Sequence, residues 1–463
     1  MPARTRRSGG WTAGFVLFVA IASQASKTGQ CLPLDAPPEN GDDTEEEVHA
    51  DPSKHHGLEE NELSMRGKES GNLHDNVWAL SGILWKRTIE TACPLNWTQT
   101  IQAQLANWER QGFTQADLDR HCIRPSLRIA VVNGSVRTAH WRIKGSASNR
   151  FVCATWLVHA ASAWSMAHRG NPLPDLEMVV QSSDGAQSTV SSGLLWPNAG
   201  PLFGSTKCSQ DASVSFPLSI HDQFGGHGSG AMQLKLYWNN YARLSELENI
   251  PWEEKQARAF FSSGSASGEK AAWERGQRAA LFALDAHPLL QIERKDYPLA
   301  ELGKYRYLIY AYGRCGWSRR IHELAFVRAV IFMEASSCTE YMQGVLRPGV
   351  DYIPVKEDFS DLARQVEWVH SQPDRARILA DNWYTRARPI FSLPCVLAYT
   401  EGLLRAYAKM QLSLVPSRED WPVFDPELES ARSPKFLSTH GSVLPSATCP
   451  IVHVPRVRSG LAC

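Results

Sequence analysis

The sequence predicts an α/β fold, because segments typical of strands alternate with segments typical of helices along most of the chain. In the first half, residues 127–132 and 176–180 are short apolar runs that end at turn residues, and residues 151–168 form a longer apolar stretch of helical length. The alternation recurs from residue 307 onward. A chain of 463 residues, 43% of them hydrophobic, is long enough for two domains of ordinary size.

The remaining elements follow from the same periodicities. We expect folded sequence from about Asn76 and a helix over residues 98–109, where Ile101, Leu105 and Trp108 recur at helical spacing. The strands expected in the second half are residues 307–312, 329–332 and 352–355, with a helix over 321–328. Three later helices carry the apolar stripes Leu362, Val366 and Val369; Ala376, Leu379 and Trp383; and Leu397, Thr400, Leu404 and Tyr407.

The N-terminal residues 1–26 predict a cleaved signal peptide. A basic start containing Arg4, Arg6 and Arg7 precedes the apolar residues 11–22, and small residues follow. This apolar run is too short to cross a bilayer of about 30 Å as a helix, although a signal anchor is the alternative. No later run is apolar enough for a stable membrane span, so none is expected.

Residues 27–75 predict a disordered acidic stem, because they contain few apolar side chains and include the acidic run 42–47. The chain as a whole is neutral, with 48 basic and 48 acidic side chains, so no nucleic-acid partner is expected and any anion must bind at a local site. The ten cysteines form no Cys-x-x-Cys pair, which favours disulfides or buried thiols over a zinc site. Two sequons predict glycosylation at Asn96 and Asn133.

A short segment after the strand at 307–312 has the pattern of a diphosphate site of Rossmann type. Gly313 lets the backbone approach a ligand, and Ser318 as a helix N-cap leaves the first backbone N–H groups for a phosphate. Arg319 and Arg320 can add charge-assisted bonds to that phosphate. Two surface arginines on a capped helix are the alternative interpretation, and Trp317 can either stack on a base or sugar or pack.

Several blocks in the same order resemble glycosyltransferase family 90, the group of Rumi-like protein O-glucosyltransferases and capsule-associated xylosyltransferases. They are residues 304–320, residues 352–362, and a C-terminal block with Cys395 and residues 407–411. The resemblance covers about residues 76–412. Several ordered blocks are more specific than any one of them.

The resemblance implies a GT-B-like fold, in which two Rossmann-like lobes hold the donor in a cleft between them. We therefore expect an acceptor-side lobe at residues 76–230, onto which the final helix packs back, and a nucleotide-sugar-binding lobe at residues 231–412. Residues 413–463 are rich in Pro and Ser and predict an irregular tail. A disulfide from Cys395 to Cys93 or Cys122 is retained as a hypothesis.

The resemblance also implies an inverting transfer of glucose or xylose from UDP-glucose or UDP-xylose to a hydroxyl of a protein, such as an EGF-like domain, or of a glycan. It implies no metal or other cofactor, and a location in the lumen of the endoplasmic reticulum or Golgi, or secretion. Such a transfer needs one carboxylate as general base and cationic groups for the leaving diphosphate. A catalytically inactive binding protein with the same fold is the alternative.

The implied base is Asp184, because residues 173–180 resemble the block that precedes the base in the family. An aspartate after the carboxyl end of a strand lies where such sheets bind ligands. Considered without the resemblance, Asp184 before Gly185 is a turn residue.

The donor-binding block of the family resembles residues 261–267, which gives Ser263 and Ser265 as donor contacts. The arginines of that block are missing from this chain, so one basic contact is in doubt unless Arg319 and Arg320 together supply it. This departure motivates the alternative of a catalytically inactive binding protein.

Three further residues are candidates for the cleft. His221 and Asp222 begin a glycine-rich loop that the resemblance places on the acceptor side; a metal is not expected there, because the loop lacks a rigid element to fix ligands. Glu340 faces the ribose or sugar of the donor, or it is a carboxylate at a helix start, and both interpretations stay open.

Overall fold

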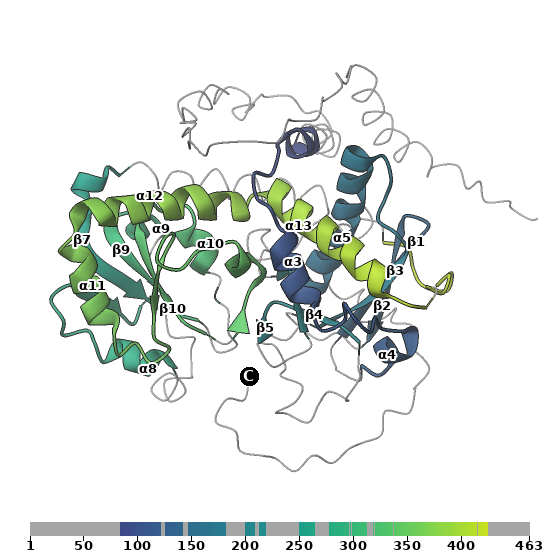
Figure 1. Ribbon diagram of the computed structural model, residues 1–463, viewed down its shortest axis with the longest axis horizontal. Helices are drawn as coiled ribbons and strands as arrows, with labels where there is room; N and C mark the ends of the chain where they lie inside the picture. Colours follow the sequence, from purple (N-terminus) through teal and green to yellow (C-terminus); the bar gives the residue numbers. More distant parts are fainter. Residues whose placement is uncertain are drawn as a thin grey trace, which may run out of the picture. The chain divides into compact units, whose positions relative to one another are not determined.

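The α/β fold class is confirmed by the structure, a computed structural model with two five-stranded sheets and surrounding helices (Figure 1). Its described parts lie within one compact unit, residues 77–463. The residues that the structure describes are 84–121, 126–141, 147–181, 200–208, 213–218, 250–263, 277–295, 297, 299–312, 318, 320–336, 338–413 and 415–424. The expected signal peptide and acidic stem lie outside them.

The first sheet is mixed, with strand order β2-β1-β3-β4-β6. Its strands are β1 (Ser126–Val132), β2 (Ser135–Trp141), β3 (Leu176–Gln181), β4 (Leu202–Gly204) and β6 (Ser213–Ser215). β1 pairs antiparallel with both β2 and β3, whereas β3, β4 and β6 run parallel. The strands expected at residues 127–132 and 176–180 are therefore confirmed as β1 and β3.

A two-residue turn joins β1 to β2. Asn133 and Gly134 both have positive φ angles, 50° and 75°, as the turns that suit the twist of a hairpin require. Asn133 is exposed, and so is Asn96 of the other sequon. Both asparagines are thus accessible for the glycosylation predicted from the sequence.

The second sheet is wholly parallel, with strand order β12-β10-β9-β7-β8. Its strands are β7 (Gln256–Ser262), β8 (Leu290–Glu293), β9 (Tyr305–Tyr310), β10 (Val330–Glu334) and β12 (Ile353–Val355). The chain begins this sheet at β7 and places β8 on one side of it. It then crosses to the other side of β7, where β9, β10 and β12 follow in turn, so the strand order reverses between β7 and β9. Doubly wound sheets bind ligands at such a reversal, outside the carboxyl ends of the strands.

Alternate side chains of β9 enter two hydrophobic clusters, as expected for a strand covered on both faces. Leu308 and Tyr310 belong to one cluster, and Tyr307 and Ile309 to the other. The helices of this half are α8 (Gln277–Phe282), α9 (Leu299–Leu302), α10 (Arg320–Leu324), α11 (Leu362–His370) and α12 (Pro373–Ile390). α11 contacts β12 and α12 contacts β10, so the expected stripes of these two helices are core faces (Figure 1).

The helices of the first half are α3 (Thr98–Leu105), α4 (Gln115–Asp119), α5 (Ala147–Arg169) and α13 (Leu393–Met410). The last of these contacts α5, α3 and β3, although it follows the second sheet in the chain (Figure 1). The short strands β5 (Lys207–Cys208) and β11 (Cys338–Thr339) pair with each other. Two 3-10 helices, η4 (Trp252–Glu254) and η5 (Tyr341–Gly344), are also described, and residues 84–90 before α3 are helical as well.

A disulfide between Cys93 and Cys395 ties the segment before α3 to the first turn of α13. It is one of the two pairings that the sequence left open for Cys395. Cys338 is also disulfide-bonded. The prediction of disulfides is therefore confirmed for Cys93, Cys338 and Cys395.

A buried group of charges crosses the first sheet at Glu177, which is fully buried in β3. Its carboxylate accepts hydrogen bonds from Arg128 at 2.9 Å, Gln115 at 3.0 Å and Arg418 at 2.6 and 2.8 Å. Arg418 belongs to residues 415–424, which have no helix but pack a buried Trp421 onto Ala130, Val132 and Ala139. This part of the expected irregular tail is thus fixed to the sheet.

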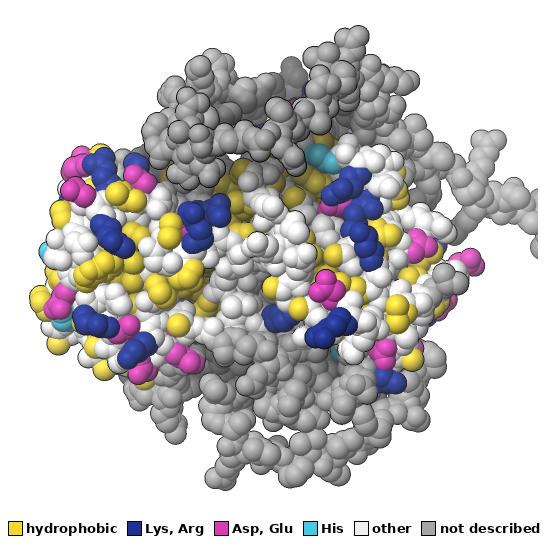
Figure 2. Space-filling view, viewed as in Figure 1, with side chains coloured by type: hydrophobic (Ala, Val, Ile, Leu, Met, Phe, Trp, Pro, Cys, Tyr) yellow, Lys and Arg dark blue, Asp and Glu magenta, His cyan; other side chains and the backbone are white. Residues whose placement is uncertain are grey.

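The distribution of charged side chains on the surface agrees with the neutral composition of the chain. On the face shown in Figure 2, Lys and Arg side chains are scattered among Asp, Glu and apolar side chains over the described elements. With no single-sign field over this face, binding of an anionic ligand must come from a local arrangement of side chains.

In the part of the chain that the structure describes, no helix is both long and apolar enough to cross a bilayer.

Candidate active site

The reversal point of the second sheet is bridged by Arg278, which projects from α8. Its Nη1 donates to Ser263 Oγ at 3.0 Å, its Nε to the Tyr312 carbonyl at 3.0 Å and its Nη2 to the Ala311 carbonyl at 3.2 Å. Ser263 directly follows β7, and Ala311 and Tyr312 directly follow β9. The guanidinium is thereby fixed at the carboxyl ends of the two strands between which the order reverses.

A second guanidinium lies near the same aromatic ring as the first. Arg320 at the start of α10 places its Cζ 5.0 Å from the centroid of the Phe261 ring, and Arg278 places its Cζ 5.6 Å from the same centroid. Burial lowers the pKa of Arg278 to about 10, and the positive charge of Arg320 lowers it as well. Two like charges that share a partly buried site favour the binding of an anion.

Ser318 and Glu340, two residues predicted to contact the donor, are joined through Tyr310 at the end of β9. The Ser318 N–H donates to the Tyr310 hydroxyl at 3.1 Å, and that hydroxyl donates to Glu340 Oε1 at 3.1 Å. Glu340 is buried and is the N-cap residue of η5, where its N–H donates to Gln343 Oε1 at 2.8 Å. The position of Glu340 therefore matches the helix-start interpretation, while a donor contact stays a prediction.

The helix after Ser318 differs from the expected one. The sequence predicted a helix over residues 321–328, but α10 ends at Leu324, since the chain has to turn back before β10 begins at Val330. A single-turn helix has a weak dipole. Anion binding here must therefore depend on side-chain charge more than on the helix terminus that the sequence emphasised.

A buried carboxyl group lies close to these arginines. Glu334 ends β10 and is 2% exposed; its Oε2 accepts the Tyr312 N–H at 2.7 Å, and its Oε1 has no hydrogen-bond partner among the described residues. Burial raises the pKa of Glu334 to about 7, as does the charge of Glu357, against the Tyr312 hydrogen bond and the positive charge of Arg278. The carboxyl group can therefore change its protonation near neutral pH.

The raised pKa makes a prediction about stability. Because the pKa of Glu334 rises from 4.5 to about 7 on folding, its stabilising contribution is complete below pH 4.5 and is lost as the pH rises through 7. E334Q cannot ionise at this position. We therefore expect its free energy of unfolding to exceed that of the unmodified protein by about 1–3 kcal/mol at pH 8, and to be nearly equal to it at pH 4. Urea denaturation at the two pH values measures this, and equal stabilities at pH 8 contradict it.

The structure places some of the predicted site residues together. Ser263, Ser318, Arg320 and Glu340 are described, and the first three lie on or beside the segments that follow β7 and β9. The predicted residues outside the described part of the chain are Asp184, His221, Asp222, Ser265, Gly313, Trp317 and Arg319. The roles of all these residues remain predictions.

Arg278 and Glu334 were not predicted from the sequence. Arg278 lies in a segment without a motif, and its position depends on three acceptors from β7 and β9. Glu334 fell outside the expected strand 329–332, although its place at the carboxyl end of a parallel strand is a signal that could have found it.

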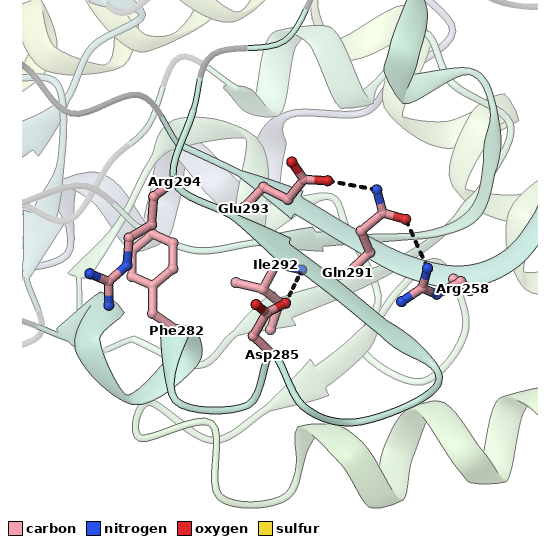
Figure 3. A pocket seen from close by; sticks show the side chains of 7 residues that line it. All are labelled: Arg258, Phe282, Asp285, Gln291, Ile292, Glu293 and Arg294. Carbon is pink, nitrogen blue, oxygen red and sulfur yellow. Dashed lines mark hydrogen bonds between the residues drawn. The ribbon is translucent and has the colours of Figure 1, made fainter.

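A separate pocket of about 580 Å³ opens at the edge strand β8 (Figure 3). Its lining residues are Arg258, Phe282, Asp285, Gln291, Ile292, Glu293 and Arg294. Figure 3 shows Arg258, Gln291 and Glu293 in a chain of hydrogen bonds, with Arg294 over the Phe282 ring. The pocket includes none of the predicted site residues, so it does not form part of the candidate active site.

Metal binding was considered for the described residues as well. Among them, no group of three or more His, Cys, Asp or Glu side chains is arranged to hold a metal ion. His221 and Asp222, the pair weighed for a metal in the sequence, lie outside these residues.

Comparisons with known proteins relate the chain to glycosyl transferases. The sequence model of the family described as Glycosyl transferase family 90 matches residues 88–435. Protein O-glucosyltransferase 1 of Homo sapiens is 24% identical over 274 residues, which are 55% of this chain and 68% of that protein. Protein O-glucosyltransferase 1 of Rattus norvegicus is 25% identical over 267 residues (54% and 66%), and the O-glucosyltransferase rumi homolog of Aedes aegypti is 23% identical over 273 residues (51% and 62%). The matches span about two thirds of the length of these relatives.

Proposed function

Because the chain belongs to glycosyl transferase family 90, we propose that it transfers a sugar, glucose or xylose, from a UDP-sugar to a hydroxyl of a protein or glycan acceptor. The names of its relatives, protein O-glucosyltransferases, support glucose as donor sugar and a protein as acceptor. The observation that carries the proposal is the reversal point of a wholly parallel sheet with basic side chains at its carboxyl ends.

The donor end of this reaction needs a site for a leaving nucleotide diphosphate. The proposed site contains Ser318, Arg320 and the adjoining Arg319, which bind the diphosphate oxygens through charge-assisted hydrogen bonds. Ser263 and Ser265 after β7 border the same site. Negative charge develops on the diphosphate as the glycosidic bond breaks, so these cations stabilise the transition state more than the bound donor.

The acceptor end needs a base. Asp184, which follows β3 in the sequence, takes the proton of the acceptor hydroxyl. The hydroxyl oxygen of the acceptor attacks the anomeric carbon from the side opposite the diphosphate. Backside attack inverts the anomeric configuration. No metal is proposed, because arginine side chains supply the positive charge.

The proposed location of the reaction is the lumen of the endoplasmic reticulum or Golgi, and secretion of the protein is the other proposed fate.

A donor screen tests the proposal. Purified protein is incubated with UDP-glucose or UDP-xylose and with an EGF-like domain or a glycan acceptor, and release of UDP is measured. We expect acceptor-dependent UDP release with one of the two donors. An absence of release with both donors and both acceptors argues against the proposed activity.

The alternative is a catalytically inactive binding protein, which the missing arginines of residues 261–267 motivate. Thermal unfolding with and without UDP distinguishes an inactive protein that still binds UDP from a protein that has no nucleotide site. A ligand at about a hundred times its Kd adds roughly 2.7 kcal/mol of stability. Stabilisation by UDP without turnover in the donor screen favours the inactive binding protein.

A further inference from the structure

Arg278 is the strongest candidate for a role that the proposed function leaves unassigned. The segment at residues 261–267 lacks the arginines expected of a donor site, yet a guanidinium from another element lies at its start, bonded to Ser263 Oγ at 3.0 Å. We propose that Arg278 supplies the second positive charge of the donor diphosphate site, in place of the missing arginines. This inference rests on the proposed function, because it presumes a nucleotide diphosphate as ligand.

Arg278 is anchored by hydrogen bonds to the segments that follow β7 and β9. Three of its acceptors are the carbonyls of Ala311 and Tyr312 and the hydroxyl of Ser263. These three acceptors are neutral, so they orient the guanidinium without adding a negative charge beside it. They also come from both strands at the reversal point, which puts the charge where a doubly wound sheet binds its ligand.

Arg278 and Arg320 contact the same aromatic side chain. Both guanidinium carbons lie near one Phe261 ring, at 5.6 and 5.0 Å from its centroid. Burial and the charge of Arg320 both lower the pKa of Arg278, so the apo site holds its two cations at a cost in free energy. A diphosphate carries several negative charges and removes this repulsion when it bridges the two guanidinium groups.

Glu334 also interacts electrostatically with Arg278. A fully ionised carboxylate there would neutralise Arg278, but burial raises the pKa of Glu334 to about 7. Near neutral pH the carboxyl group is therefore only partly ionised, so it offsets less than one of the two positive charges of Arg278 and Arg320. The site is thus electrostatically suited to an anion.

The experiment measures the Kd of UDP by isothermal titration calorimetry for the unmodified protein and for R278Q, R278K and R258Q. Arg258 is the matched control, because it is a part-buried arginine of β7 that also donates to a backbone carbonyl, that of Leu290 at 2.7 Å. We expect R278Q to weaken UDP binding about ten- to a hundredfold, as the loss of charge-assisted bonds predicts, and R258Q to change it less than about twofold.

The lysine variant separates charge from anchoring. R278K keeps the positive charge but loses the three fixed bonds, so a role in anion binding predicts a UDP affinity much closer to that of the unmodified protein than R278Q shows. If Arg278 only ties β7 to β9, R278K and R278Q weaken binding equally, which overturns the inference. R278Q binding UDP as tightly as the unmodified protein also overturns it. An unmodified protein that binds no UDP overturns the proposed function itself.

Discussion

Replacing Asp184 with asparagine is expected to reduce the rate of sugar transfer about a hundred- to ten-thousandfold, which is the usual contribution of a positioned general base. Asparagine has nearly the shape of aspartate but cannot take the proton of the acceptor hydroxyl. Binding of UDP is expected to stay within about twofold, because the proposed role of Asp184 is to act on the acceptor hydroxyl and not to bind the diphosphate. Release of UDP in the presence of donor and acceptor measures the rate.

Asp175 provides a matched control for this substitution. It lies just before β3, whereas Asp184 follows β3 in the sequence; Asp175 is exposed and accepts the Asn133 N–H at 2.8 Å. The side chain of D175N can accept the same bond, so we expect its activity to match that of the unmodified protein. If D184N keeps full activity, Asp184 is not the base, and another carboxylate must take that role.

The second large effect is expected at Glu177. In E177Q the buried Arg128 and the partly buried Arg418 lose the charge that neutralises them, at 2.9 and 2.6 Å. Removing one partner of a buried ion pair costs about 3–5 kcal/mol, because the other charges remain buried. Asp119, which also pairs with Arg128, is half-exposed and offsets only part of this loss. Urea denaturation measures the change in unfolding free energy.

An exposed ion pair gives the comparison. Glu90 pairs with Lys86 at 3.7 Å, and both side chains are more than half exposed (63% and 64%). Exposed pairs of this kind contribute little, so E90Q is expected to change the unfolding free energy by less than about 0.5 kcal/mol. Equal losses in E177Q and E90Q contradict the view that the Glu177 cluster fixes residues 415–424 to the sheet.

The elements that the sequence predicted are those with strong periodicity. Strands β1, β3, β9 and β10 are mostly apolar, α5 is a long apolar stretch, and α11, α12 and α13 carry clear apolar stripes, so local pattern alone identified them. β7 and β8 were missed. β7 begins with the exposed or half-buried Gln256, Ala257 and Arg258, and β8 has only four residues with alternating burial. Their strand structure depends on pairing within the sheet, of β7 with β8 and β9 and of β8 with β7.

The candidate site shows the same division. The sequence indicated Ser318 and Arg320, because they follow a recognisable strand and resemble a family block. It could not indicate Arg278, whose position follows from the parallel register of β7 and β9 and from acceptors far away in the sequence. The shift in the pKa of Glu334 likewise comes from burial, which no sequence pattern reports. Tertiary contacts therefore supply what local sequence leaves out.

The most direct measurement is a crystal structure of the protein with UDP bound. Our account predicts the diphosphate at the carboxyl ends of β7 and β9, with its oxygens at hydrogen-bonding distances of about 3 Å from the guanidinium groups of Arg320 and Arg278. UDP bound elsewhere, for example in the pocket at β8 in Figure 3, contradicts that account.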